Sequence, residues 1–427
     1  MAIDDETRKA LLEELEDLEG NISAEIQVIT DDIEEIREAV LKLGESGPVA
    51  DSIADIRKRL QATEPPPGPD PDPDPPTPGA RKPFRAGFNA DNTKRNRILD
   101  PSGRPFVAMG PNMFPFWGAT YLDKYNPTGI PDLRRQMLDH VDRMGANIAR
   151  IVTQTGQDRT KWAWNCSPRV HRQLVEACIA KGIVPMLEMH DSTTDRVVNP
   201  HGFYDPAITT YWLSPEVIAM LIANPECWVN IANEANFRKG SEVTTLGHVE
   251  AWVAHYNGVI KQLRAKGVKN LIVVDSGGTF AQDHTFILNG GKRILDADPE
   301  HNVVMSWHMY QFWQENPQRW PTGQFAPSVE IPKLASLDVP VILGEFGWHQ
   351  PAHSDIPYNA KQVFDLCEAN GIGTCFWADF DGLPRYNLVN DLVSARDGLG
   401  PEQLTPAGEA LVPYWQARRE ARRARFA

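Results

Sequence analysis

The 427-residue sequence predicts an α/β fold, a (β/α)8 TIM barrel preceded by an N-terminal helical segment and a proline-rich linker. Three observations support the barrel. Eight short apolar runs follow one another from about residue 84, and helix-like patterns or helix-length connections separate them. No glycine-rich phosphate loop follows the first run, which disfavours the open doubly wound sheet as the alternative.

The apolar runs are continuous rather than alternating, which is typical of parallel strands that are buried on both faces. Each run is short enough to cross a barrel wall once. The expected strands are FVAMGPN (106–112), NIARIVT (147–153), IVPMLEMHD (183–191), CWVNIANE (227–234), NLIVVDSG (270–277), NVVMSWHMY (302–310), PVILGEFG (340–347) and GTCFWADF (373–380).

The segments between these runs include amphipathic helical patterns. Several begin with a Ser, Thr or Asn cap or an early proline, and several end on glycine. The expected helices cover residues 131–145, 167–182, 249–267, 359–371 and 405–415.

Residues 1–62 predict a coiled-coil-like helix. Apolar residues recur there at spacings of three and four, with one additional four-residue step between Ile22 and Ile26 that would locally relax a left-handed supercoil. A stripe this narrow cannot be buried by one helix alone. We therefore expect a homo-oligomer, with isoleucine at most seam positions favouring a trimer, or docking on a larger assembly. A helix folded back on the main domain is the alternative.

Residues 63–83 form a Pro/Asp-rich linker, with nine prolines between Pro65 and Pro78. Proline at this density favours extended polyproline II, a semi-rigid spacer. The predicted barrel domain occupies residues 84–417, and we expect the basic tail, residues 418–427, to be the solvated end of the last helix.

The net charge of −14 belongs to the N-terminal part of the chain. Residues 1–60 contain 17 acidic and 7 basic side chains, and residues 61–80 add four acidic ones. The remaining residues are electrically balanced. The main domain therefore gives no electrostatic reason to expect a nucleic acid or an anionic membrane as a partner.

The cysteines and the N-terminus limit the cellular context. The five cysteines have no CxxC or metal-ligand spacing, so we expect buried free thiols. The acidic N-terminus lacks the apolar core of a secretory signal, and no run is long enough to span a bilayer. The localisation stays open, and a virion-associated protein released by lysis would fit.

Polar residues gather at the carboxyl ends of the predicted strands, where a barrel of this type has its active site. Each of them alone has an ordinary structural explanation, such as a satisfied core histidine or a helix cap. Their shared position on six of the eight strands indicates a functional site. These residues are Arg150, His190, Asn233, Glu234, His308, Tyr310, Glu345 and Trp377.

Two glutamates on different strands suit glycoside hydrolysis, in which one carboxyl donates a proton and the other must be ionised. Arg150 and Tyr310 could keep one carboxylate ionised, and Asn233 could hold a sugar hydroxyl beside the other. Metal chemistry fits less well, because the chain has no HxH motif after the first strand and no HExxH motif. A GxSxG elbow is also absent, so we do not expect a serine hydrolase. We also expect no cofactor.

Residues 86–415 resemble glycoside hydrolase family 5. The resemblance rests on GANIARIV, VPMLEMHD, VNIANE, HMY, ILGEFG and CFW, in that order. It implies Glu234 as the acid/base and Glu345 as the nucleophile of a retaining enzyme, with Arg150 and Tyr310 beside the nucleophile. It further implies Asn233 on the sugar. His190 and His308 would line the subsite of the sugar on the non-reducing side of the scissile bond, and Trp377 would be its platform.

Within that family, the strings LEMHD, NIANEA, LIVVDSGG, ILDADPEHNVVMSWHMYQF and ILGEFG look most like the bacterial β-1,4-mannanase branch. Two positions depart from it, because Ala235 and Asp379 stand where that branch usually has aromatic residues. The expected activity is a retaining endo-β-1,4-glycanase acting on mannan or glucomannan. One alternative is a cellulase. The other is a carbohydrate-binding structural protein mounted on a larger assembly such as a phage particle.

Further aromatic residues in predicted loops could form additional sugar subsites of an open cleft, although we expect at most half of them to do so. These are Phe114, Phe116, Trp117, Trp162, Trp164, Phe312, Trp313 and Trp348.

Overall fold

The computed structural model of the chain describes residues 81–113, 133–155, 168–190, 204–238, 242–314, 325–348, 359–379, 387–389 and 402–422. The predicted helical segment at residues 1–62 lies outside these ranges, as do the proline-rich part of the linker and the end of the basic tail. Those assignments stay predictions.

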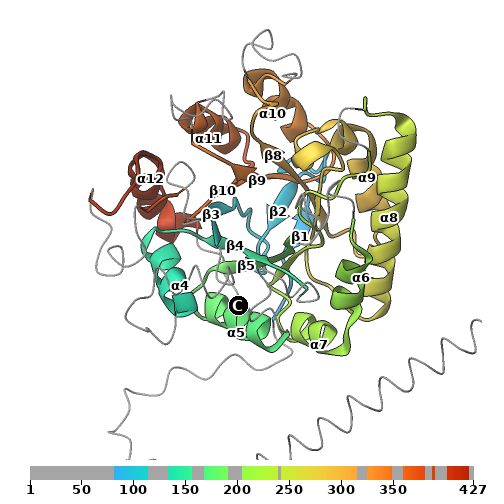
Figure 1. Ribbon diagram of the computed structural model, residues 1–427, viewed down its shortest axis with the longest axis horizontal. Coiled ribbons are helices and arrows are strands. Elements are labelled where there is room, and N and C mark those ends of the chain that lie inside the picture. The colour runs from blue at the N-terminus through green and yellow to red at the C-terminus, as the bar shows by residue number, and fades with distance from the viewer. Residues whose placement is uncertain are drawn as a thin grey trace, which may run out of the picture. The chain divides into compact units, whose positions relative to one another are not determined.

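Eight parallel strands form a closed barrel, as the sequence predicts (Figure 1). Each strand pairs with its neighbour in the chain, and the last strand pairs with the first. The strands are β3 (Met109–Met113), β4 (Ile148–Thr153), β5 (Val184–Met189), β6 (Trp228–Asn230), β7 (Ile272–Asp275), β8 (Val303–Met309), β9 (Val341–Phe346) and β10 (Gly373–Phe376).

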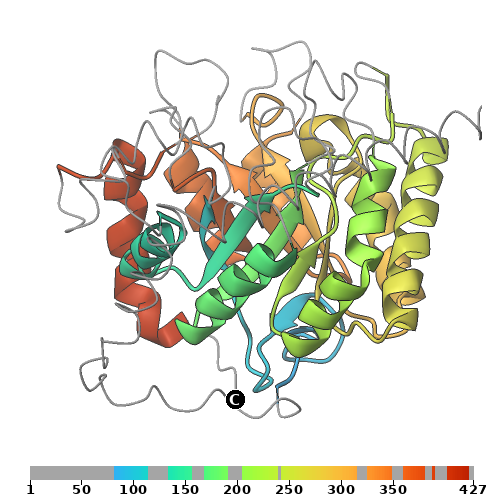
Figure 2. The same cartoon turned by 60° about the horizontal axis from the view of Figure 1, so that its bottom comes forward.

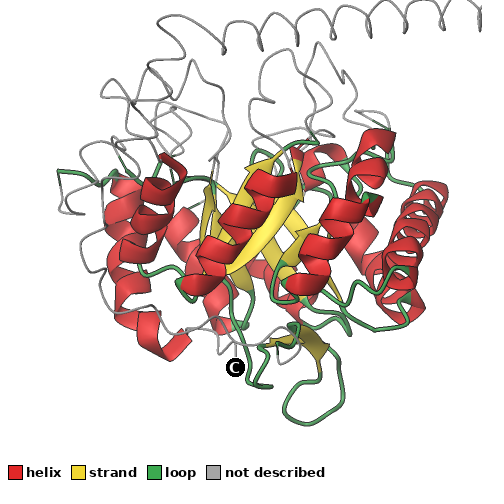
Figure 3. Ribbon diagram, turned by 90° about the horizontal axis from the view of Figure 1, so that it is seen from below, coloured by secondary structure: helices red, strands yellow, loops and turns green. Residues whose placement is uncertain are grey.

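Helices surround the barrel on its outer side (Figure 3). The five expected helices are present as α4 (Leu133–Arg143), α5 (Pro168–Ala180), α8 (Leu246–Ala265), α11 (Ala360–Ala369) and α12 (Pro406–Arg422). The structure adds elements that the sequence pattern did not single out, namely α6 (Pro206–Leu213), α7 (Pro215–Ala223), η2 (Thr279–Ala281), η3 (Ile287–Gly291), α9 (Lys292–Ala297) and α10 (Pro327–Ala335).

The ends of the helices show why these segments start and stop where they do. Thr245 caps α8 by accepting from the His248 N–H, and Asn359 caps α11 in the same way. Gly145 follows α4 with φ +78°, and a Cβ there would lie 2.6 Å from the Gln416 Cα of α12. Only glycine fits this close approach of two helices.

A short antiparallel hairpin closes the amino-terminal end of the barrel and was not predicted (Figure 2). Its strands are β1 (Arg85–Gly87) and β2 (Arg97–Leu99). Phe84 and Phe106 pack edge to face against Trp228, with ring centroids 5.5 and 5.8 Å away. Asn302, just before β8, accepts from the Ala86 N–H and donates to the Phe84 carbonyl. This apolar plug leaves the carboxyl end as the open end.

The interior of the barrel changes from apolar to polar along the strands. Ile148, Met186 and Val273 belong to the apolar cluster in the lower barrel. Two residues further along each strand, on the same face, are Arg150, Glu188 and Asp275, all buried. The fold therefore places a charged layer directly above the apolar plug.

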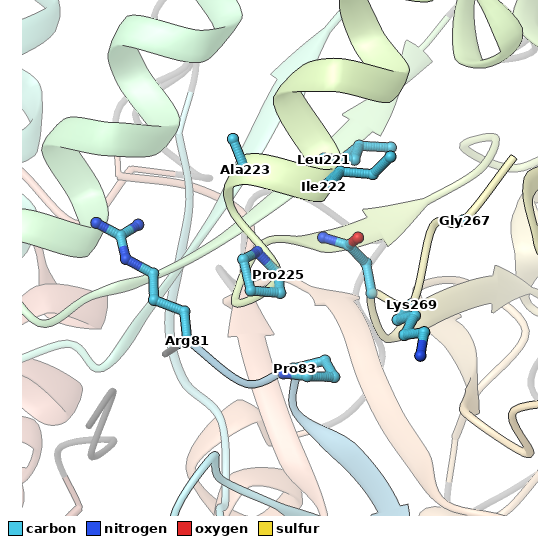
Figure 4. A pocket seen from close by; sticks show the side chains of 9 residues that line it. Arg81, Pro83, Leu221, Ile222, Ala223, Pro225, Gly267 and Lys269 are labelled. Atoms are coloured by element: carbon cyan, nitrogen blue, oxygen red, sulfur yellow. The ribbon is translucent and has the colours of Figure 1, made fainter. Parts of the chain in front are cut away.

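A separate cavity of about 280 Å³ lies at the amino-terminal end of the barrel (Figure 4). It is lined by Arg81 and Pro83 together with residues of the connections before β6 and β7, including Pro225 and Lys269. The cavity is therefore at the opposite end of the strands from the predicted site.

The last helix continues past the predicted boundary at residue 417. Arg419 lies 2.5 Å from Asp142 of α4, and Arg422 pairs with Glu368 of α11. This part of the basic tail packs against two neighbouring helices, whereas the sequence suggested a solvated end. None of the helices that the structure describes has the length and hydropathy to cross a bilayer.

The cysteine prediction is confirmed for the four cysteines that the structure describes. Cys178, Cys227, Cys367 and Cys375 are buried free thiols. Burial raises their pKa values, that of Cys227 and that of Cys375 to about 12, so these thiols stay protonated at neutral pH.

Candidate active site

Seven of the eight predicted site residues lie at or beyond the carboxyl ends of the strands, whereas Arg150 lies in the middle of β4. Five of them, His190, Glu234, Tyr310, Glu345 and Trp377, line a cavity of about 240 Å³ together with Phe280, Gln282 and Gln311. The other three, Arg150, Asn233 and His308, are fully buried. The structure thus divides the predicted set into side chains that face the cavity and side chains that lie behind it.

Glu234 is presented by a tight turn after β6. Its backbone is in the left-handed region with φ +49°, which a non-glycine residue rarely adopts. The Glu234 N–H donates to Oδ2 of Asp275 at 3.2 Å, and the Asn233 N–H donates to the Met189 carbonyl at 2.8 Å. Hydrogen bonds to two neighbouring strands therefore hold this strained turn in place.

Glu345 reaches the interior through an irregularity in β9. Trp307 pairs with Leu343, but the next residue, His308, pairs with Glu345, so Gly344 is left out of the register. A Cβ on Gly344 would lie 2.3 Å from Oγ of Ser306. Glycine permits this bulge, and the bulge turns Glu345 to the inner face.

Arg150 is the central cation of the site. Its Nη1 donates to Oε1 of Glu345 and to Oδ1 of Asn112, each at 2.7 Å. Its Nε donates to Asn230 at 2.9 Å, and its Nη2 donates to Oδ1 of Asn233 at 2.6 Å. This planar network fixes the orientation of the Glu345 carboxylate and of the Asn233 carboxamide.

Acidic neighbours keep Arg150 charged although it is buried. Burial lowers the pKa of the guanidinium, but the carboxylates of Glu188, Glu345 and Asp275 outweigh burial and raise it. The positive charge next to Glu345 is therefore permanent.

His308 lies between the two glutamates. Its Nδ1 is 2.8 Å from Oε1 of Glu234 and 3.4 Å from Oε2 of Glu345, and its Nε2 is 3.5 Å from Oδ2 of Asp275. Burial lowers the pKa of His308, whereas Glu345, Asp275 and Glu234 together raise it above the ordinary value. The resemblance implied a place in the sugar subsite, but the structure buries His308 behind the carboxylates.

Tyr310 donates to Oε2 of Glu345 at 2.8 Å, so both oxygens of this carboxylate have a partner. Burial nevertheless raises the pKa of Glu345 to about 7, and Glu234 adds to the rise while His308 and Arg150 oppose it. The cationic neighbours therefore offset only part of the effect of burial on Glu345.

His190 and Trp377 form one wall of the cavity. Their rings stack with centroids 5.7 Å apart and an interplanar angle of 24°. Nδ1 of His190 is 2.8 Å from Oε1 of the buried Glu188. Burial lowers the pKa of His190, but Glu188 outweighs it and the pKa is raised. Trp377 is half-buried, as a platform for a sugar ring would be.

Four buried residues of the site were not predicted: Asn112, Glu188, Asn230 and Asp275. Asn112 and Asp275 lie on the first and fifth barrel strands, the two strands on which the sequence analysis named no site residue. Side chains two positions apart on a strand point to the same face, so each of these residues lies on the same face as an apolar residue of the barrel interior. This alternation could have identified them from the sequence.

The two departures from the mannanase branch are both buried. Ala235 is 1% exposed and Asp379 is 0% exposed, and the Asp379 N–H donates to the Asn112 carbonyl at 2.9 Å. Neither position offers a surface to a sugar, so the aromatic contacts are not replaced by other exposed side chains at these positions.

One of the additional aromatic candidates is wrong as a subsite residue. Trp313 is fully buried, packs against Trp307 and donates from Nε1 to the Gln282 carbonyl at 2.9 Å. Phe312 and Trp348 are partly buried against the core. The remaining five candidates lie outside the described residues.

Glu234, His308 and Glu345 each bring one potential metal-ligand atom within 4.8 Å of the others. A cation at this point would have to displace the proton between His308 and Glu234 and would lie beside the permanently charged Arg150. The donor set is therefore better suited to a hydrogen-bonded pair of carboxyl groups than to a resident metal ion.

Two buried glutamates at the carboxyl ends of separate strands, with one cation and one tyrosine on the second, define a glycosidase built on a (β/α)8 barrel. Comparison with known proteins supports this class. The family model described as "Cellulase (glycosyl hydrolase family 5)" matches residues 99–379. The chain belongs to glycosyl hydrolase family 5 and is an O-glycosyl hydrolase, as the sequence predicts.

Among characterised relatives, a mannan endo-1,4-beta-mannosidase from Salipaludibacillus agaradhaerens is 28% identical over 296 residues, which are 69% of this chain and 81% of that protein. The enzyme of the same name from Cellvibrio japonicus is 22% identical over 66% of this chain and 57% of its own length. The fold is similar to that of the beta-mannanase from Thermomonospora fusca in its mannohexaose complex, with a TM-score of 0.58 and 21% identity over 78% of this chain and 94% of that one.

Proposed function

We propose that the protein is a retaining endo-β-1,4-mannanase that cleaves β-mannan or glucomannan, with Glu345 as the nucleophile and Glu234 as the acid/base. One observation carries this proposal. One carboxylate oxygen of Glu234, one carboxylate oxygen of Glu345 and one ring nitrogen of His308 all lie within 4.8 Å of one another. Retaining glycosidases need carboxyl groups about 5 to 5.5 Å apart, whereas an inverting pair needs about 6.5 to 9.5 Å to admit a water molecule.

The contacts of the two glutamates support their different roles. Glu345 accepts from Arg150 and from Tyr310, and both bonds stabilise its ionised form for attack on the anomeric carbon. Glu234 lies on the other side of His308 and lines the cavity. It donates its proton to the leaving oxygen as the bond between the sugar and Glu345 forms.

The second step reverses the proton transfer. Glu234, now ionised, takes a proton from water, and the resulting hydroxide equivalent releases the sugar from Glu345 with its original anomeric configuration. His308 lies 2.8 Å from Glu234 and 3.4 Å from Glu345, where a positive charge balances whichever carboxylate is ionised. Asn233, oriented by Arg150, is the candidate partner of the sugar 2-hydroxyl.

We favour mannan over glucan as the substrate, because both relatives described above are named mannan endo-1,4-beta-mannosidase. The stacked pair of His190 and Trp377 supplies an apolar face for one pyranose ring beside the glutamates.

Glucan is the second candidate. A relative named "Beta-mannanase/endoglucanase A" from Caldicellulosiruptor saccharolyticus is 27% identical over 62% of this chain, although the match spans only 18% of that protein. Ala235 and Asp379 also lack the aromatic surfaces usual in the mannanase branch. A carbohydrate-binding role without catalysis is less well supported. Both glutamates are present, Glu345 keeps its bonds to Arg150 and Tyr310, and Glu234 keeps its contact with His308.

The test is release of reducing sugar from β-mannan, glucomannan and carboxymethylcellulose by the full chain. Glu234→Ala and Glu345→Ala are measured beside it, with Glu216→Ala as the control because this glutamate is exposed at the start of α7. Activity on mannan that both site variants abolish and the control retains is the expected result. Cleavage of cellulose with none of mannan contradicts the mannanase assignment, and a folded but silent wild type favours the binding role.

Azide separates the two roles. With Glu345→Ala, azide replaces the missing nucleophile and yields an α-glycosyl azide, whereas with Glu234→Ala it attacks the glycosyl-enzyme and yields the β-anomer. The opposite pairing of variants and anomers would reverse the assignment, and rescue in neither variant would contradict the double-displacement mechanism.

A further inference from the structure

Asp275 ends β7 and lies beneath both glutamates at 1% exposure. Its Oδ1 accepts from Nδ2 of Asn230 at 3.1 Å, and its Oδ2 accepts from the Glu234 N–H at 3.2 Å. The same Oδ2 lies 3.5 Å from Nε2 of His308 and 3.6 Å from Nη2 of Arg150. One buried carboxylate thus contacts the turn that presents one glutamate and the two cationic groups beside the other.

We propose that Asp275 is a positioning residue for catalysis, which fixes the turn that presents Glu234 and holds His308 in its positively charged form between the two glutamates. This inference rests on the proposed function of that pair and adds the element that organises it. Asp275 has no place in the reaction itself, because it is not among the residues that line the cavity in the described part of the chain.

The turn gives the first reason. Glu234 has φ +49°, a conformation that is strained for a non-glycine residue and persists only where the surroundings enforce it. The hydrogen bond from the Glu234 N–H to Asp275 fixes the residue whose carboxyl must donate the proton. Without this acceptor the N–H would remain buried and unsatisfied, so the turn would relax and displace the carboxyl group.

The charge on His308 gives the second reason. The imidazole faces Glu234 on the turn after β6, Glu345 on β9 and Asp275 on β7, with the guanidinium of Arg150 on β4 nearby. Burial alone would lower the pKa of His308, and these carboxylates reverse the direction. Glu234 and Glu345 change charge during the reaction, so Asp275 is the acid of this group that can hold His308 charged throughout the cycle.

Two substitutions separate these effects. Asp275→Asn removes the negative charge, but its remaining side-chain oxygen can still accept from the Glu234 N–H. The Asn230 Nδ2, which would lose its bond to the other oxygen of Asp275, also lies 3.5 Å from the Val273 carbonyl. Asp275→Ala removes both the charge and the acceptor. Asp298→Asn is the matched control, since Asp298 is also a buried aspartate but pairs with Arg264 at the opposite end of the barrel.

The charge effect is measured by NMR titration of the histidine ring protons, with the His308 signal assigned by its loss in His308→Gln. We expect the pKa of His308 to fall by at least one pH unit in Asp275→Asn and to stay unchanged in Asp298→Asn. An unchanged titration in Asp275→Asn overturns the proposal. This readout needs no substrate, so it decides the question even if the wild type proves inactive on mannan.

The turn effect is measured with aryl β-mannobiosides and aryl β-cellobiosides of different leaving groups. A 2,4-dinitrophenyl group leaves without protonation, so a displaced acid affects it little. We expect Asp275→Ala to lose at least 100-fold in kcat/KM on the 4-methylumbelliferyl glycoside and less than 10-fold on the dinitrophenyl glycoside. Equal losses on both contradict the positioning role of Asp275. A wild type that cleaves neither sugar series contradicts the proposed function instead.

Discussion

Replacing Glu345 with glutamine measures how much the buried, ionised carboxylate of Glu345 lowers the free energy of unfolding. Glu345 is 2% exposed, and burial raises its pKa from the ordinary 4.5 to about 7. In the unfolded chain the same carboxyl group ionises near 4.5. Between these two values the folded state binds the extra proton, so the stability that Glu345 contributes is complete below pH 4.5 and is lost as the pH rises to about 7.

The magnitude follows from the two pKa values. Each pH unit between them corresponds to about 1.4 kcal/mol, so the interval corresponds to about 3 kcal/mol as an upper bound. Glutamine is neutral at every pH and keeps nearly the same shape. Glu345→Gln should therefore resemble the wild type in stability at pH 5 and exceed it at pH 8. For a domain of this size about 1 to 2 °C in Tm corresponds to 1 kcal/mol, so the gain is about 5 °C.

The assay is differential scanning calorimetry of the wild type and Glu345→Gln at pH 5, 6, 7 and 8. Glu216→Gln, an exposed change on α7, serves as the control and should follow the wild type at every pH. A Tm difference that does not grow with pH would refute the reasoning. It would mean that Arg150 and His308 compensate fully for burial of the charge.

Two further predictions follow from the contacts and from the sequence pattern. Tyr310→Phe removes the 2.8 Å bond to Glu345, so we expect kcat/KM to fall by about 10- to 100-fold and its acidic limb to move to higher pH, with Tyr414→Phe on α12 as the control. A loss below threefold with an unmoved pH profile would contradict the proposed support of the nucleophile. Deletion of residues 1–80 should convert an oligomer into a monomer in light scattering without reducing activity on short soluble substrates, because the predicted helical seam lies in residues 1–62. An unchanged mass would remove the proposed oligomerisation role of that segment.

The sequence predicted the barrel because its signals are local. Parallel strands buried on both faces have continuous apolar sequences, and each of the eight predicted runs overlaps one of the barrel strands. Glycines and caps at the helix ends are equally local. The β1–β2 hairpin escaped prediction because its three-residue strands are too short to show a hydrophobic period.

The candidate residues at the strand ends were predictable for a related reason. Since the carboxyl ends of barrel strands meet at one end, a polar residue after an apolar run is a candidate wherever it lies in the chain. This rule brought Glu234 and Glu345 together although they are far apart in sequence. Asn112 and Asp275 also satisfy this rule, but their role is visible only in their contacts with Arg150, which comes from another strand.

By itself, then, the sequence predicted the barrel and the eight side chains of the candidate site. Only the tertiary structure decided which of them face the cavity and which lie behind it. It also decided that the bulge at Gly344 turns Glu345 inward and that His308 lies between the two glutamates. The physical reason is that strand register, close backbone approach and burial arise from contacts between segments distant in the chain. The residue pattern of a single strand does not determine those contacts.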